Sequence, residues 1–182
     1  ILGPKMTDAG RHPRITIHTL SEVVNIKGYV GNFDVKIVKK ARYVNEKECT
    51  ACGDCAEVCP VVRPDEFNMG LSSRKAIYSP FPQAVPSAYV LNPGECLGNN
   101  PTVCNKCLEA CEKKCIDFHM SDETISERVG TIIVATGLEP HDPRILDEYG
   151  YTRFENVLTS LEFERLVNAG GPTQGKLLRP TD

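Results

Sequence analysis

The sequence contains no tryptophan, few aromatic residues and no surplus of basic residues. Aromatic residues make up 7% of the 182 residues, and the formal net charge is −3 at pH 7. Proteins that bind nucleic acid usually carry a basic patch or stripe that pairs with phosphate groups. Because acidic residues outnumber basic ones here, we expect no nucleic-acid partner.

A long apolar run and a secretory leader are also missing. No part of the sequence is apolar over the roughly 20 residues that a membrane-spanning helix needs, and we see no signal-peptide pattern. We therefore expect no membrane partner and a cytoplasmic location. The sequence begins with Ile1 instead of methionine and stops shortly after the loop-like "NAGGPTQG", so we expect it to be part of a longer protein.

Cysteine is the residue that stands out by its abundance. Nine cysteines fall in two groups between Cys49 and Cys115. A secreted disulfide framework usually has an even number of cysteines at wider spacing, and thiols this crowded cannot all reach the geometry of a disulfide. The cysteines therefore indicate metal or cluster binding in a reducing compartment.

The two groups of cysteines belong to an internal repeat. "RYVNEKEC" followed by "CGDCAEVC" resembles "AYVLNPGEC" followed by "CNKCLEAC". Each half predicts a Tyr-Val strand, then a first cysteine, and then three cysteines separated by two and by three residues. The halves differ in one loop, because two residues separate Cys49 from its triplet and seven separate Cys96 from the other. The five extra residues lie within positions 97–103.

The stretch "CTACGDCAEVCP", residues 49–60, follows the pattern C-x2-C-x2-C-x3-C-P. It resembles the bacterial-type two-cluster ferredoxins, in which three cysteines of a run hold one [4Fe-4S] cluster and the fourth holds the other. The resemblance covers residues 41–120 and implies two clusters with crossed ligands. The implied ligands are Cys49, Cys52, Cys55 and Cys111 for the first cluster, and Cys96, Cys104, Cys107 and Cys59 for the second.

The second half of the repeat departs from this pattern at two positions. The long loop after Cys96 leaves Cys115, the ninth thiol, as an alternative to Cys96, although the repeat gives Cys115 no counterpart. Glu112 stands where a proline usually follows the last cysteine of a run. Zinc also favours pairs of cysteines two residues apart, so a structural zinc module remains an alternative to iron-sulfur clusters.

The flanking segments predict regular secondary structure. "RITIHTL" and "VVNIKGYVGNFDVKIV" have the alternation of strands, and Gly31-Asn32 is a turn signal, so we predict a hairpin. "TISERV" predicts another strand, and the apolar run at residues 132–135 is typical of a strand buried on both faces. "TSLEFERLVNAG" predicts a short amphipathic helix that starts after Thr159 or Ser160.

The apolar run ends in Ala135, Thr136 and Gly137. This A-T-G turn resembles the second flavin motif of flavoproteins of the thioredoxin reductase type, which implies that the three residues contact FAD. The G-x-G-x-x-G loop that such a fold places at its start is absent from the sequence. We therefore expect FAD in the full-length parent and not in this fragment.

The arrangement as a whole resembles the A subunits of heterodisulfide reductases and their relatives, iron-sulfur flavoproteins of methanogens and sulfate reducers. The resemblance rests on "YVGNFDVKIVKKARYV", "YSPFPQAVP" and "VGTIIVATGLEP". It implies an α+β chain in which a ferredoxin-like domain with two [4Fe-4S] clusters, residues 41–120, is inserted in pieces of a thioredoxin-reductase-like α/β flavoprotein domain, residues 1–40 and 121–182.

The resemblance also implies a function and a set of partners. The fragment would transfer electrons as part of an oxidoreductase and contain no catalytic residue, while FAD in the parent divides electron pairs by flavin-based bifurcation during methanogenesis. The implied partners are the other heterodisulfide reductase subunits, hydrogenase or formate dehydrogenase as electron donors, and external ferredoxin, and a homodimer is compatible with them. A free-standing two-cluster ferredoxin and the zinc module are the alternative functions.

Overall fold

The computed structural model describes residues 2–99 and 103–181. The chain mixes short helices and strands, which confirms the predicted α+β content. It forms two compact units, one of Ile1–Val61 with Lys75–Val134 and one of Val62–Arg74 with Ala135–Asp182. Within the loop predicted to hold the five extra residues, positions 100–102 lie outside the described residues.

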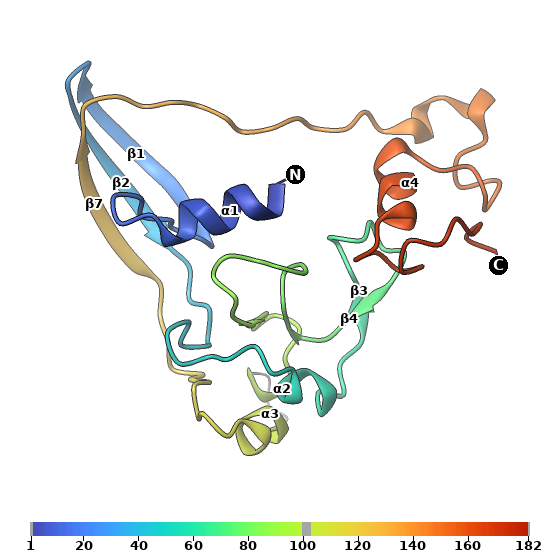
Figure 1. Cartoon of the computed structure of the whole chain (residues 1–182), viewed down its shortest axis with the longest axis horizontal. Helices are drawn as coiled ribbons and strands as arrows, with labels where there is room; N and C mark the ends of the chain where they lie inside the picture. The colour runs from blue at the N-terminus through green and yellow to red at the C-terminus, as the bar shows by residue number, and fades with distance from the viewer. Residues whose placement is uncertain (1, 100–102, 182) are drawn as a thin grey trace. The chain divides into compact units, whose positions relative to one another are not determined.

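The first unit contains a three-stranded antiparallel sheet in the order β1-β2-β7 (Figure 1). The strands are β1 (Ser21–Tyr29), β2 (Asn32–Lys39) and β7 (Glu123–Val129). β1 and β2 form the predicted hairpin, in which Tyr29 pairs with Asn32. Gly31 has a φ of 90°, a left-handed conformation that glycine adopts without steric cost. The predicted turn at this position is therefore confirmed.

β2 and β7 lead the chain into and out of the cysteine-rich segment at neighbouring positions. Lys39 pairs with Glu123 at the end of the sheet. Just beyond this pair, Asp122 accepts hydrogen bonds from the Ala41 amide at 2.9 Å and from Lys40 Nζ at 3.0 Å. These two bonds hold the pKa of the Asp122 carboxyl below its ordinary value. We call these five residues, Lys39, Lys40, Ala41, Asp122 and Glu123, the neck.

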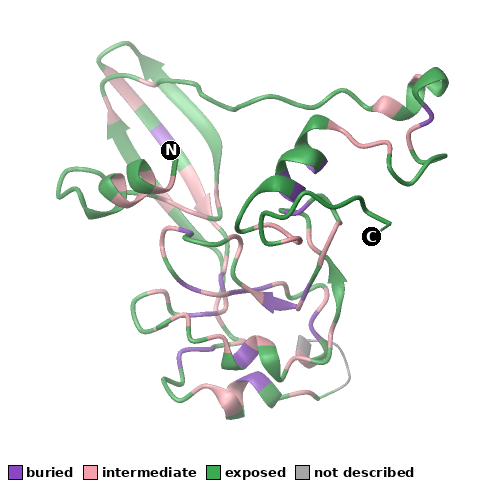
Figure 2. Cartoon of the chain, turned by 45° about the vertical axis from the view of Figure 1, so that its right-hand side comes forward, coloured by how far each residue is buried: buried purple, intermediate pink, exposed green. Residues whose placement is uncertain are grey.

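The cysteine-rich segment is built from very short elements. They are α2 (Asp54–Glu57), β5 (Ile77–Tyr78), β6 (Val90–Leu91), η1 (Leu97–Asn99) and α3 (Lys106–Ala110). β5 and β6 pair antiparallel, and α2 packs against α3. Figure 2 shows buried residues gathered among these elements, whereas β1 is exposed along most of its length.

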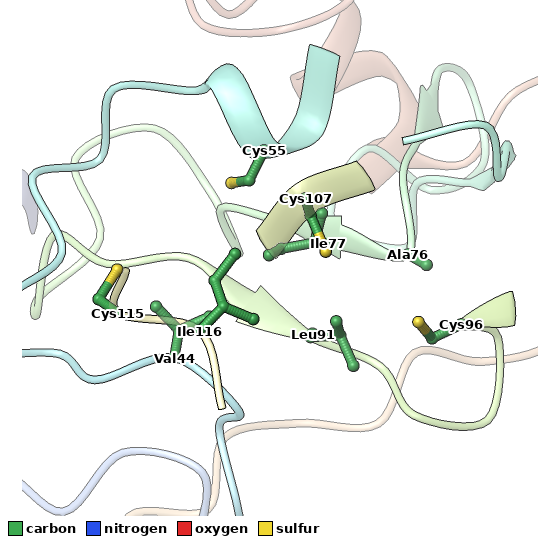
Figure 3. Packing of buried hydrophobic residues seen from close by; sticks show 9 residues of the cluster. All are labelled: Val44, Cys55, Ala76, Ile77, Leu91, Cys96, Cys107, Cys115 and Ile116. Carbon is green, nitrogen blue, oxygen red and sulfur yellow. The ribbon is translucent and has the colours of Figure 1, made fainter. Parts of the chain in front are cut away.

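Cysteines form a large part of the hydrophobic core of this segment. Ile77 and Leu91 are its largest fully buried side chains. Figure 3 shows the nine buried members of the cluster, and four of them are cysteines. The nine residues are Val44, Cys55, Ala76, Ile77, Leu91, Cys96, Cys107, Cys115 and Ile116. Because thiols occupy so many core positions, the stability of the segment depends on the state of those thiols.

The second unit contains helix α4 (Ser160–Val167) and a small two-stranded sheet of β3 (Arg63–Pro64) and β4 (Ser73–Arg74). Thr159 caps α4 and forms a capping box with Glu162, in which each side chain bonds the other residue's backbone amide. Such a box satisfies two donors at the start of a helix. The helix predicted to start after Thr159 or Ser160 is confirmed. Two 3-10 turns, Pro143–Ile145 and Asp147–Tyr149, precede it.

Arg165 of α4 is the buried polar centre of the second unit. Its Nε donates to Asn68 Oδ1 at 3.0 Å, and its guanidinium lies 4.4 Å from the centroid of the Phe67 ring. Asn68 in turn donates to Asp65 at 2.8 Å and to Ser72 at 2.9 Å. Arg165 therefore joins the helix to a loop that lies about a hundred residues earlier in the chain.

We expect Arg165→Ala to lower the free energy of unfolding of the second unit by about 2–3 kcal/mol, since it leaves the buried Asn68 oxygen without its charged donor. Backbone amides of residues 62–74 should exchange with deuterium faster in this variant. Arg153→Ala is the matched control, because Arg153 also lies over a ring, 4.8 Å from Phe154, but is exposed. Equal exchange in the two variants would contradict the prediction.

Two predicted strands of the flanking segments are absent from the described residues, and the Tyr-Val strand predicted in the first half of the repeat is reduced to an isolated bridge of Val44 with Ile116. "RITIHTL", residues 14–20, has no strand, and no neighbouring strand pairs with it. Residues 131–142 have no regular secondary structure, and Ile133 and Val134 are 89% and 78% exposed. The prediction of a buried strand at 132–135 is therefore wrong for this chain, because the pairing partners that an apolar run requires do not lie beside it.

Helix α1 (Leu2–Arg11) precedes the sheet and was not predicted. Pro4 lies within the first turn of this helix, where a proline is tolerated because its missing amide would have no partner in the helix. None of the helices in the described part of the chain has the length and apolar character needed to cross a membrane.

Candidate metal centres

Two hollows lie inside the cysteine-rich segment, and each is lined by four of the eight predicted ligands. The first hollow has a volume of about 70 Å³ and the second of about 20 Å³. The first is lined by Cys49, Cys52, Cys55 and Cys111, with Cys115 as a fifth thiol. The second is lined by Cys59, Cys96, Cys104 and Cys107.

The structure thus groups the thiols in the same fours that the ferredoxin resemblance implies. Cys59 follows the first run along the chain but lines the hollow of the second run. Cys111 does the reverse and lines the hollow of the first run. The packing of α2 against α3 produces this exchange, because it brings the end of each run toward the other run. That the eight thiols bind iron stays a prediction.

The first run bends around its hollow through two residues with positive φ. Ala51 has a φ of 55° and Gly53 has a φ of 101°. Cys49 is held by its amide, which donates to Asn45 O at 3.0 Å. A Cβ at Gly53 would lie 3.4 Å from Tyr89 Oη. The turn therefore combines a tight backbone path with close packing, and three thiols of the run face one space.

Burial and mutual proximity raise the pKa values of the innermost thiols. The pKa of Cys55 is raised to about 12, first by burial and then by the charges of neighbouring thiols such as Cys49 and Cys107. The pKa of Cys107 is raised to about 11 by burial and then by Cys96 and Cys59. At neutral pH these thiols hold their protons, so binding of a metal or cluster has to release protons.

Cys115 lies where sequence reasoning did not place it. Its Sγ is 3.5 Å from the Sγ of Cys111, and it lines the first hollow, whereas Cys96 lines the second. Burial raises the pKa of Cys115 to about 12, with a further contribution from Cys111. The spacing of cysteines could not reveal this, because Cys115 lies outside the repeat.

The donor set fits iron-sulfur clusters. All the predicted ligands are thiols, and thiolates are the ligands that hold [4Fe-4S] clusters. The thiols surround two spaces and do not converge on one point. Within residues 2–99 and 103–181, no group of three histidine, cysteine or acidic side chains lies close enough to hold a single metal ion.

The predicted flavin contacts lie apart from the thiols in the sequence. Ala135, Thr136 and Gly137 belong to the exposed stretch without regular structure. Gly137 has a φ of 77°, which permits a close backbone approach to a ligand. Their contact with FAD stays a prediction.

Comparison with known proteins gives matches to both the cysteine run and the whole chain. Residues 42–62 match the family described as 4Fe-4S binding domain. The chain is 53% identical over 182 residues to the second iron-sulfur A subunit of CoB–CoM heterodisulfide reductase from Methanopyrus kandleri. It is 48% identical to the A subunit of the H(2):CoB-CoM heterodisulfide,ferredoxin reductase of Methanothermobacter marburgensis, and 46% to that of the H(2)/formate:CoB-CoM heterodisulfide,ferredoxin reductase of Methanococcus maripaludis.

These matches include every residue of the chain but only part of each relative. The chain spans 27% of the length of each of the three proteins. The predicted resemblance to the A subunits of heterodisulfide reductases is therefore confirmed, and it extends over the flanking segments as well as the cysteine runs. The match of residues 42–62 indicates [4Fe-4S] binding.

Proposed function

We propose that this chain, as a segment of the A subunit of a heterodisulfide reductase, transfers electrons through two [4Fe-4S] clusters. The observation that carries the proposal is the grouping of eight cysteines around two hollows, four to each. The similarity over all 182 residues supports such a segment over a free-standing ferredoxin, because it includes the stretches before and after the cysteine runs.

The clusters, when bound, supply sites that accept and release one electron at a time. The contribution of the chain is to hold them and to exclude water. Cys55 and Cys107 lie on the packed helices α2 and α3 and are both buried. Because α2 packs against α3, the two hollows that these cysteines line lie close together. This proximity favours electron transfer from one cluster to the other.

The flanking segments are proposed to join this electron path to a flavin. The cysteine-rich residues 41–120 would then be a domain inserted between residues 1–40 and 121–182 of a thioredoxin-reductase-like flavoprotein domain. The close spacing of the two strand ends at the neck supports an insertion of this kind. In the full-length protein, Ala135, Thr136 and Gly137 would contact FAD.

The proposed partners follow from the names of the relatives. Those names mention H(2), formate and ferredoxin, which supports hydrogenase or formate dehydrogenase as the electron donor and ferredoxin as an external acceptor. Further heterodisulfide reductase subunits and a second copy of the same polypeptide complete the proposed complex. The crowding of nine thiols supports a reducing cytoplasmic location.

Measurement of iron and acid-labile sulfide tests this function. The chain is purified without oxygen, and we expect about eight irons with a matching amount of sulfide, as two [4Fe-4S] clusters require. After reduction by dithionite, we expect an electron paramagnetic resonance signal of reduced clusters at low temperature. Bound zinc without sulfide would replace this proposal by the structural zinc module.

A further inference from the structure

The first hollow has one thiol more than a [4Fe-4S] cluster needs. The second hollow is lined by four cysteines, whereas Cys115 joins the other four at the first. The extra thiol is not a surface residue, because Cys115 is only 5% exposed. Its Sγ lies 3.5 Å from Cys111 Sγ, so the two sulfur atoms approach the hollow from nearly the same position.

The backbone between the two thiols explains why they point the same way. Helix α3 ends before Cys111, and the Lys114 amide donates to Cys111 O at 3.0 Å. Lys114 has a φ of 48°, so the chain reverses within one turn and returns its next side chain to the hollow. Cys115 is thereby brought beside the residue four positions earlier.

The position of Cys115 is fixed independently of α3. Its carbonyl accepts a hydrogen bond from the Asn45 amide at 2.7 Å. The next residue, Ile116, pairs with Val44 in an antiparallel bridge, and both side chains are buried. Cys111 follows a helix of five residues, while Cys115 is tied to the extended segment that continues the neck. The two thiols therefore reach one hollow from two separately anchored pieces of backbone.

We propose that Cys115 is a reserve ligand of the first cluster and replaces Cys111 on the same iron. This inference rests on the proposed function. In the exchange, the bond from iron to Cys111 Sγ breaks and a bond from iron to Cys115 Sγ forms. The proton that Cys115 loses is taken up by Cys111. No electron is gained or lost, and four thiolates hold the cluster before and after.

Iron content of single and double variants tests the reserve ligand. The full chain is prepared without oxygen as the wild type, Cys111→Ala, Cys115→Ala and Cys111→Ala/Cys115→Ala. We expect about eight irons in the first three proteins and about four in the double variant. Cys59→Ala is the matched control, because Cys59 is the crossed ligand of the hollow without a fifth thiol, and we expect it to retain about four irons.

A spectroscopic measurement separates ligation from a general effect on folding. A change of the ligating cysteine alters the surroundings of one iron, so the resonance signal of the first cluster should shift clearly in Cys111→Ala and less in Cys115→Ala, which loses only the contact of Cys115 Sγ with Cys111 Sγ. A Cys111→Ala chain that loses about half of its iron, as Cys59→Ala does, overturns the proposal.

The outcomes also distinguish this inference from the proposed function. A wild-type chain without iron and sulfide contradicts the function itself. A wild-type chain with about eight irons and a Cys111→Ala chain with about four contradict the reserve ligand alone. A Cys111→Ala chain that does not fold counts against it as well, because a working reserve ligand would complete the first cluster.

Discussion

Cys59→Ala is expected to remove the second cluster and to leave the first in place, although Cys59 belongs to the first cysteine run. The reason is the proposed exchange of ligands between the two hollows, because Cys59 lines the second hollow with Cys96, Cys104 and Cys107. Iron content should fall from about eight to about four per chain. Cys52→Ala should cause a loss of the same size from the other cluster, since Cys52 lines the first hollow.

Double variants show which cluster each cysteine serves. Cys59→Ala/Cys104→Ala removes two ligands of one hollow, so it should retain as much iron as Cys59→Ala alone. Cys52→Ala/Cys59→Ala removes one ligand from each hollow, so it should retain almost none. Residues that act on one unit are strongly non-additive, whereas independent sites add.

The two double variants would show the reverse iron contents if the ligands were not exchanged between the hollows. If each run held its own cluster, Cys52 and Cys59 would serve the same one, and their double variant would keep about four irons. Cys59→Ala/Cys104→Ala would then lose almost all of its iron. The two double variants therefore separate the two arrangements with the same measurement.

Leu91→Ala is expected to lower the free energy of unfolding of the cysteine-rich segment by about 2–5 kcal/mol, the usual cost of such a cavity in a core. Leu91 is 2% exposed, pairs with Ile77 across β5 and β6, and lines the second hollow. Few other aliphatic side chains contribute to this core, because cysteines fill four of the nine positions in the buried cluster. A loss of this size is a large part of the stability of a typical domain.

Loss of visible absorbance on heating measures this effect, since the clusters are released when the segment unfolds. The transition of Leu91→Ala should occur at a clearly lower temperature than that of the wild type. Leu177→Ala serves as the matched control, because Leu177 is 73% exposed, and it should change stability by less than about 0.5 kcal/mol. Equal transitions for the two variants would show that the clusters alone determine stability.

Local signals in the sequence were sufficient for the parts of the fold that local contacts determine. The β1–β2 hairpin needs only alternation of apolar residues and a turn at Gly31. The cap of α4 needs only Thr159 and Glu162, three residues apart. The grouping of thiols was implied by the resemblance of the C-x2-C-x2-C-x3-C-P run to two-cluster ferredoxins, and the spacing of the repeat does not give it without that resemblance.

Long-range contacts account for what the sequence did not reveal. The pairing of β2 with β7 joins residues that lie more than eighty positions apart, such as Lys39 and Glu123. The position of Cys115 depends on the bridge between Val44 and Ile116, which no spacing of cysteines encodes. An apolar run such as residues 132–135 indicates a preference for burial, and only its neighbours in space decide whether a strand forms.

The neck has a consequence for how such a chain can be altered. Lys39 and Glu123 lie opposite each other, and Asp122 closes the gap with Ala41. The entropic cost of closing a loop grows only slowly with its length. The stability of the sheet therefore depends little on the number of residues inserted between β2 and β7. An unrelated module whose termini lie equally close can therefore replace the cysteine-rich segment at this junction while the three strands keep their register.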